Sequence, residues 1–150
     1  MDGVVEQRKE KLLASLRTKQ TYLIYLAFAL IAGFGYYIRT RALPLLIDVT
    51  TGDYIPSDPD AMGILRYVQY VVDHGQLMSI DYLRYYPTGF TGLDEFSLLA
   101  HLIAYFYHFL HFFNPSVTVG FADVIFPAYA FVIALVFFFL LLQKIFDWKV

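Results

Sequence analysis

Two long runs without a charged residue constrain this chain more than any other feature of its sequence. Residues 21–38 (TYLIYLAFALIAGFGYYI) carry no charge, and neither do residues 124–142 (VIFPAYAFVIALVFFFLLL). At roughly 1.5 Å per residue, the first run spans about 27 Å as a helix, which is close to the thickness of a bilayer's hydrocarbon core. We therefore predict transmembrane helices at 21–38 and 124–143, in an all-α integral membrane protein with two spans.

The composition of the chain also favours a membrane protein. Hydrophobic residues make up 59% of its 150 residues and charged residues only 16%, whereas soluble domains are typically about 45–50% apolar and about 25% charged. The absence of cysteine excludes a disulfide scaffold, a zinc ribbon and a thiol enzyme. A net charge of -2 provides no basic field for nucleic acid. We expect the lipid bilayer as a partner and no nucleic acid.

The charges around the first run predict how the chain is oriented. Residues 1–20 are polar and helix-prone, and the bases close to the run are Arg8, Lys9, Lys11, Arg17 and Lys19. The positive-inside rule then predicts a cytoplasmic N-terminus, a cell-membrane location and a cytoplasmic end at 144–150. A cleaved signal peptide is the alternative, but the long polar lead and the lack of a clear cleavage pattern favour a retained helix.

An acidic segment, residues 39–95, follows the first run and is predicted to be an external loop. It carries eight acidic residues against four basic ones. Within it, apolar residues recur at three- and four-residue spacing, which predicts an amphipathic helix over 59–74. Asp58 stands where an N-cap is expected, Pro59 follows in the first turn, and Gly75 ends the helix.

The segment 96–113 (FSLLAHLIAYFYHFLHFF) allows two interpretations. It carries no acid, lysine or arginine, yet it holds three histidines and two tyrosines. If it crossed the bilayer, Lys144 and Lys149 would lie on the wrong side. We favour an aromatic helix in the bilayer interface, where rings are half buried and their polar atoms stay wet. A connecting loop at 114–123 then leads to the second span, with Pro127 near its first turn.

The residues best suited to chemistry are the two carboxylates at the start of the amphipathic helix. Asp58 and Asp60 are hard oxygen ligands, which suit Mg²⁺ or Mn²⁺. The structural alternative is that Asp58 caps the helix and Asp60 complements its dipole. Arg66 lies further along the helix, where it either neutralises Asp60, meets a phosphate, or is a solvated charge on the polar face.

A more specific pattern runs through the same region. Its elements, in order, are Asp60, Arg66, Tyr67, Tyr70, Gly75 and the stretch RYYPTG at 84–89. This order resembles the first external loop of the oligosaccharyltransferase catalytic subunit, most of all in its archaeal single-chain members. In that family an aromatic interfacial helix and a second span come next, and the resemblance extends over residues 20–146.

The resemblance implies a fold and an activity. The family has the multi-span GT-C glycosyltransferase fold and transfers an oligosaccharide from a polyprenyl (dolichol) phosphate or diphosphate to Asn in Asn-x-Ser/Thr of an acceptor polypeptide. The Asp of this loop is a ligand of Mn²⁺ or Mg²⁺ beside the acceptor amide. Its spacing to Arg66 and Gly75 assigns that role to Asp60, with Asp58 as the alternative because Pro59 follows it. Arg66 is a weaker candidate for substrate contact.

The differences from the family limit this expectation. Its members have many more spans, a second acidic motif and a C-terminal domain that reads the acceptor sequence. We therefore expect an N-terminal part of such an enzyme, inactive by itself, so that enzymatic activity of these 150 residues alone is uncertain. There are two alternative functions. The chain belongs either to another GT-C glycosyltransferase that uses a polyprenyl-phosphate sugar or to a non-enzymatic membrane partner.

Overall fold

The computed structural model describes the backbone of residues 2–146 and the side chains of residues 19–146. Within this part of the chain the protein is helical and has no strand, which agrees with the all-α prediction. The helices are α1 (Asp2–Thr40), α2 (Pro59–His74), α3 (Asp94–Phe113) and α4 (Val119–Ile145), with a short 3-10 helix, η1, at Leu43–Leu46. The basic side chains predicted to orient the N-terminus at 8–17, and Lys149, lie outside the described residues.

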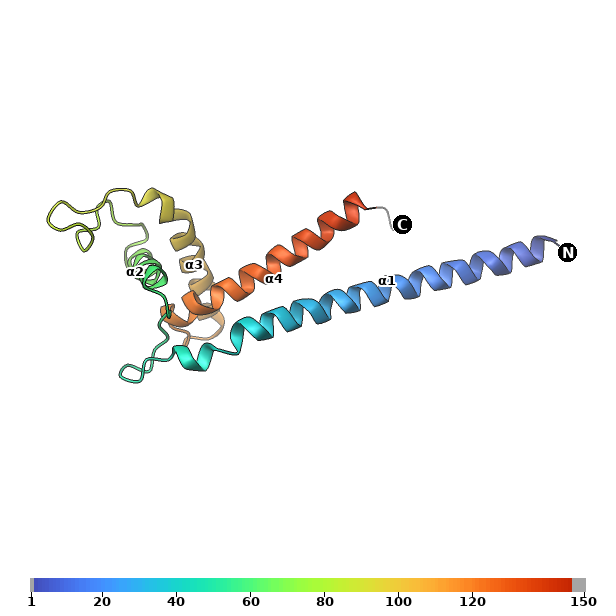
Figure 1. Cartoon of the computed structure of the whole chain (residues 1–150), viewed down its shortest axis with the longest axis horizontal. Helices are drawn as coiled ribbons and strands as arrows, with labels where there is room; N and C mark the ends of the chain where they lie inside the picture. Colours follow the sequence, from blue (N-terminus) through green and yellow to red (C-terminus); the bar gives the residue numbers. More distant parts are fainter. Residues whose placement is uncertain (1, 147–150) are drawn as a thin grey trace.

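Helices α1 and α4 lie side by side and run in opposite directions (Figure 1). Aromatic rings join them along their length: Phe28 stacks on Phe139 with centroids 4.3 Å apart, and Tyr36 meets Tyr129 edge-on at 5.6 Å. Gly35 permits this approach, because a Cβ at that position would lie 2.6 Å from the ring of Phe131. The start of α1 and the end of α4 therefore point to the same side of the molecule.

Three helices of the described chain are long and apolar enough to cross a membrane, which makes this a membrane protein. They are α1 with η1 from Lys19 onward, α3, and α4. From Lys19 onward, no side chain of α1 is fully buried inside the chain, and many large apolar ones are exposed: Leu30 is 65% exposed and Phe34 66%. Large apolar side chains exposed at this density need lipid or other apolar helices around them.

Helix α2 has the bounds that the apolar spacing predicted, and its ends explain why. Asp58 is the N-cap residue, Pro59 occupies the first helical position, and Gly75 ends the helix with a left-handed φ of 75°. The amide of Gly75 donates to the carbonyl of Val71 at 2.8 Å. Proline at the start and a left-handed glycine at the end are the usual boundaries of a helix.

Helix α4 begins earlier than predicted. The connecting loop expected at 114–123 is only 114–118, because the Thr118 hydroxyl accepts a hydrogen bond from the Phe121 amide at 3.1 Å and caps the helix there. Pro127 consequently lies in the interior of α4 rather than near its first turn. The missing N–H of Pro127 leaves the carbonyl of Asp123, four residues earlier, without its usual helical partner.

The buried core lies between α2 and α3, at the end of α1 and α4 away from the N-terminus (Figure 1). Tyr67, Val68 and Val71 of α2 meet Ala100, Ile103 and Ala104 of α3, and Val119 of α4 closes the cluster. The two alanines let the helices approach closely. Figure 1 also shows that α3 runs across the direction of α1 and α4 rather than along it.

Candidate functional site

The two predicted metal ligands stand at the first turn of α2, where the structure leaves their carboxylates free. Asp58 and Asp60 are both exposed. Asp58 has the extended backbone of an N-cap residue, but its side chain makes no capping hydrogen bond. Among the described residues, none donates a hydrogen bond or forms an ion pair with either carboxylate. Their position suits negative charge, because the helix N-terminus carries a partial positive charge.

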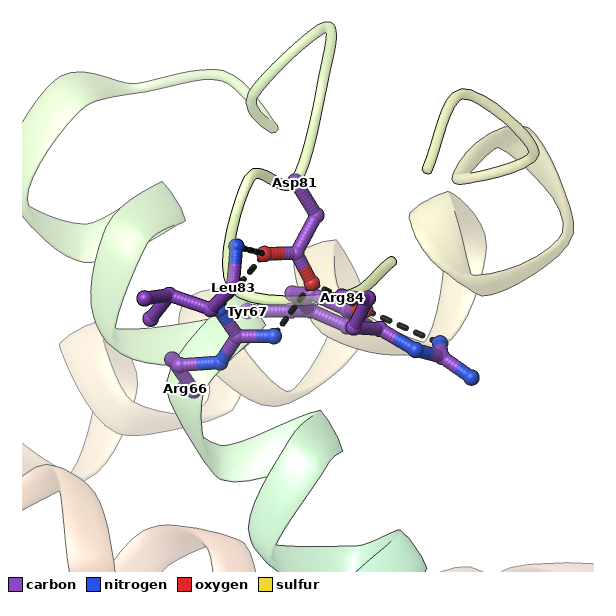
Figure 2. Close-up of polar contacts among 5 residues, drawn as sticks. All are labelled: Arg66, Tyr67, Asp81, Leu83 and Arg84. Carbon is purple, nitrogen blue, oxygen red and sulfur yellow. Dashed lines mark hydrogen bonds and ion pairs between the residues drawn. The ribbon is translucent and has the colours of Figure 1, made fainter. Parts of the chain in front are cut away.

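Arg66 does not neutralise Asp60. Its guanidinium forms a two-point ion pair with Asp81 instead: one nitrogen donates at 2.7 Å and the other makes a second, shorter contact (Figure 2). This pairing raises the pKa of Arg66. The expectation that Arg66 is a solvated charge is also wrong, because its guanidinium is paired with a carboxylate. The two-point geometry is the strongest form of this ion pair.

Asp81 is the residue around which this region is organised. Its side chain is 1% exposed, and it accepts hydrogen bonds from the Tyr67 hydroxyl at 3.0 Å and the Leu83 amide at 3.1 Å, besides those from Arg66. The Arg66 hydrogen bonds, followed by those of Tyr67 and Leu83, outweigh the effect of burial and lower the pKa of Asp81 to about 2. Each lone pair facing the protein has a donor, as a buried carboxylate requires.

The loop 81–90 is fastened to α2 by the same network. Arg84 donates to the Tyr67 hydroxyl at 3.1 Å and lies over the ring of Phe90, 4.7 Å from its centroid. The main chains of Asp81 and Phe90 exchange two hydrogen bonds, at 2.9 and 3.0 Å. Gly89 has a φ of 77°, and a Cβ there would lie 2.5 Å from Ile80, so the turn requires glycine. We call the side chains of Arg66, Tyr67, Asp81 and Arg84 the clamp.

An open groove of about 1090 Å³ lies along the face of α2 that α3 does not cover. Its walls are one side of α2 from Met62 to Asp73, the loop 48–55 and the loop 78–83, and Gly120 of α4 also lines it. Arg66 and Asp81 line it, whereas Asp58 and Asp60 do not. The structure therefore brings one of the three predicted site residues into the groove and leaves the two carboxylates at the end of α2.

The loop 48–55 is held against the start of α4. The Thr118 hydroxyl donates to the Asp53 carboxylate at 2.6 Å, and the Tyr54 amide donates to the same oxygen at 2.7 Å. Gly120 makes this contact possible, because a Cβ there would lie 2.2 Å from the Tyr54 carbonyl. The groove wall on this side is thus fixed by a side chain distant in the sequence.

Sequence reasoning missed two buried aspartates. Asp81 lies between a predicted helix and a predicted turn. The spacing between aspartates and arginines along a loop does not predict which aspartate pairs with which arginine. Asp123 directly precedes the second uncharged run and lies inside α4, because the helix begins at Val119, earlier than the charge pattern indicates. It is 7% exposed, and no hydrogen bond or ion pair reaches its carboxylate from the described residues.

The donor set at the start of α2 fits a hard divalent cation in part. No group of three or more His, Cys, Asp or Glu side chains that could hold a metal comes together in the described part of the chain. Magnesium, however, is commonly held by one or two carboxylates, with water and substrate phosphate oxygens completing its shell. Asp58 and Asp60 supply two free, exposed carboxylates, which is the number of protein ligands that such a magnesium site needs.

Comparison with known proteins identifies no relative. No family model, no curated protein and no solved structure matches the chain.

Proposed function

We propose that this chain is the N-terminal part of an oligosaccharyltransferase of GT-C type, which transfers a lipid-linked oligosaccharide to Asn in Asn-x-Ser/Thr sequences. The observation that carries the proposal is the pair of unengaged carboxylates at the start of α2, at the spacing from Arg66 and Gly75 that the family resemblance requires. A helix N-terminus with free acidic groups just beyond a membrane helix is suited to hold a cation against a phosphate-linked donor.

In this proposal Asp60 is the principal ligand of Mn²⁺ or Mg²⁺ and Asp58 the second. A divalent cation bound there would stabilise the negative charge that develops on the leaving phosphate. The carboxylate of Asp60 would also orient the acceptor amide by accepting a hydrogen bond from its N–H. The contribution of Arg66 is then to position α2, because its guanidinium forms a two-point ion pair with the buried carboxylate of Asp81.

The arrangement in the membrane that supports this function has two spans. We place α1 and α4 across the bilayer with the N-terminus in the cytoplasm, and α3 in the external interface. Three features favour the interfacial position of α3: it runs across the other two helices (Figure 1), it begins with Asp94 and Glu95, and it buries one face against α2. Its other face exposes Leu98, Tyr105 and Phe109 to the surface where a polyprenyl donor would arrive.

Transfer to defined acceptor peptides tests the proposal. Membranes from the native organism, with the gene for this chain intact or deleted, would be given a peptide with Asn-x-Thr and a matched peptide with Gln-x-Thr. The proposal predicts Mn²⁺- or Mg²⁺-dependent transfer to the Asn peptide alone, lost on deletion and restored by the gene. Transfer to a hydroxyl of both peptides would instead support another GT-C glycosyltransferase. Unchanged transfer after deletion would contradict an enzymatic role.

A further inference from the structure

The groove along α2 carries a strong and uncompensated negative charge. Four carboxylates and one guanidinium line it, and that guanidinium, Arg66, is already paired with Asp81. The remaining carboxylates are those of Asp48, Asp53 and Asp73. Their partners in the structure are hydroxyls, amides and the Gln69 side chain, all neutral. The hydrogen bonds from Thr50 and Thr51 also lower the pKa of Asp48 to about 2, so it is ionised at neutral pH.

The same groove is apolar between these charges. Met62 and Leu65 of α2, Ile55 of the loop 48–55, and Met78 and Ile80 of the loop 78–83 all line it. Methionine is unbranched and adapts to different shapes, so surfaces that accept several sequences often use it. Tyr54, Tyr70 and Tyr82 add rings that pack on alkyl chains and attract cations.

The size and charge of the groove restrict its occupant. At about 1090 Å³ and open to solvent, it is at the upper end of the roughly 300–1,000 Å³ typical of small-molecule pockets and has room for a peptide segment. Three carboxylates without a cationic partner in the described part of the chain repel a phosphate or diphosphate, which disfavours the charged part of a polyprenyl donor. Lysine and arginine combine a long alkyl stem with a cationic head, and so match a surface that alternates apolar side chains with carboxylates.

We infer that this groove binds an extended polypeptide segment that carries lysine or arginine side chains. The apolar stems would lie on Met62, Leu65 and Met78, and the cationic heads would reach Asp48, Asp53 and Asp73. The inference does not depend on glycosyl transfer, because binding is measurable without a donor. Its failure and the failure of the proposed function can therefore be told apart.

Binding of labelled peptides to the purified full chain in nanodiscs tests this inference by fluorescence polarisation. The probes are a 12-residue peptide that alternates lysine with small apolar residues, and the same peptide with every lysine replaced by glutamate. We expect saturable binding of the lysine peptide that weakens with added salt, and at least about tenfold weaker binding of the glutamate peptide. Equal binding of both peptides, or no binding of the lysine peptide at millimolar concentration, overturns the inference.

A matched pair of variants locates the binding. Asp73→Asn removes an exposed groove carboxylate whose only side-chain partner among the described residues is Gln69. Asp94→Asn removes an exposed carboxylate outside the groove with the same change in net charge. We expect Asp73→Asn to weaken binding about threefold and Asp94→Asn to leave it unchanged. Equal effects of the two variants would mean that the peptide responds to net charge alone, which contradicts a site in the groove.

Single cysteines give a second readout, since the chain has none of its own. Ser79→Cys places a thiol in the groove wall, and Ser116→Cys places one on an exposed turn outside it. A lysine peptide with a terminal bromoacetyl group should label Ser79→Cys several times faster than Ser116→Cys, after correction for free bromoacetamide. Equal corrected rates would contradict the proposed location.

Discussion

Two aspartates, Asp60 in the first turn of α2 and Asp81 beyond its end, meet opposite surroundings, although both lie in the same acidic segment of the chain. Asp81 is 1% exposed and is held by Arg66, Tyr67 and the Leu83 amide. Asp60 is exposed, and no described residue engages its carboxylate. A carboxylate whose lone pairs are already filled serves the structure, whereas one that the fold leaves free is available to a ligand. Asp81 therefore holds α2 in place, whereas Asp60 is the residue that we propose binds a ligand.

Breaking the clamp should have the largest effect on stability. Arg66→Ala leaves Asp81 buried without its cation, and we expect a loss of about 3 kcal/mol in the free energy of unfolding. The double variant Arg66→Gln with Asp81→Asn removes both charges and keeps polar groups in place, so it should lose less than Arg66→Ala. Chemical unfolding in detergent, followed by circular dichroism, measures both. A loss below about 0.5 kcal/mol for Arg66→Ala would mean that the ion pair contributes nothing.

Acid should remove the contribution of Asp81 over a defined pH range. The Arg66 hydrogen bonds lower its pKa from 3.8 to about 2, so the stabilisation is complete above about pH 4 and disappears as the pH falls towards 2. A shift of this size corresponds to about 2 kcal/mol. The unfolding free energies of the wild type and Asp81→Asn, compared at pH 6 and pH 2.5, should therefore converge in acid. A constant difference between them would contradict the pairing.

Asp123 sharpens the comparison, because it is buried as Asp81 is but has no partner in the described chain. Burying a carboxyl group without a donor is unfavourable, so Asp123→Asn should raise the free energy of unfolding by about 1 kcal/mol. Asp81→Asn is the matched control, for which the same substitution should lower stability. A loss of stability in Asp123→Asn would contradict the interpretation that this carboxylate is buried at a cost.

The parts of the fold that local rules govern could be read from the sequence. The proline after Asp58, the apolar spacing through Val71 and the glycine at position 75 gave α2 its observed bounds. The start of α4 could not be read so closely, because hydropathy marks where charges stop and not where Thr118 caps a helix. An uncharged run begins after Asp123, yet the helix includes that residue.

In the candidate site, too, some residues could be placed from the sequence and others could not. The position of Asp58 and Asp60 at the start of α2 could be predicted, because Pro59 and the apolar spacing after it mark the first turn of the helix. The pairing of Arg66 with Asp81 was not, because it joins residues 15 positions apart across a loop. Which acid meets which base depends on how the loop 81–90 folds back on α2. That fold depends on Gly89 and on the packing of Tyr67, and no local pattern reports it.

The most direct test of the account is the effect of Asp60→Asn on metal-dependent transfer, measured beside its effect on stability. The variant would replace the wild-type gene in the native organism, with Asp94→Asn as an exposed control at the start of another helix. We predict that Asp60→Asn lowers transfer to an Asn-x-Thr peptide roughly 100-fold or more at all Mn²⁺ concentrations, with stability changed by no more than about 0.5 kcal/mol. Wild-type transfer and Mn²⁺ dependence in Asp60→Asn would contradict the assignment.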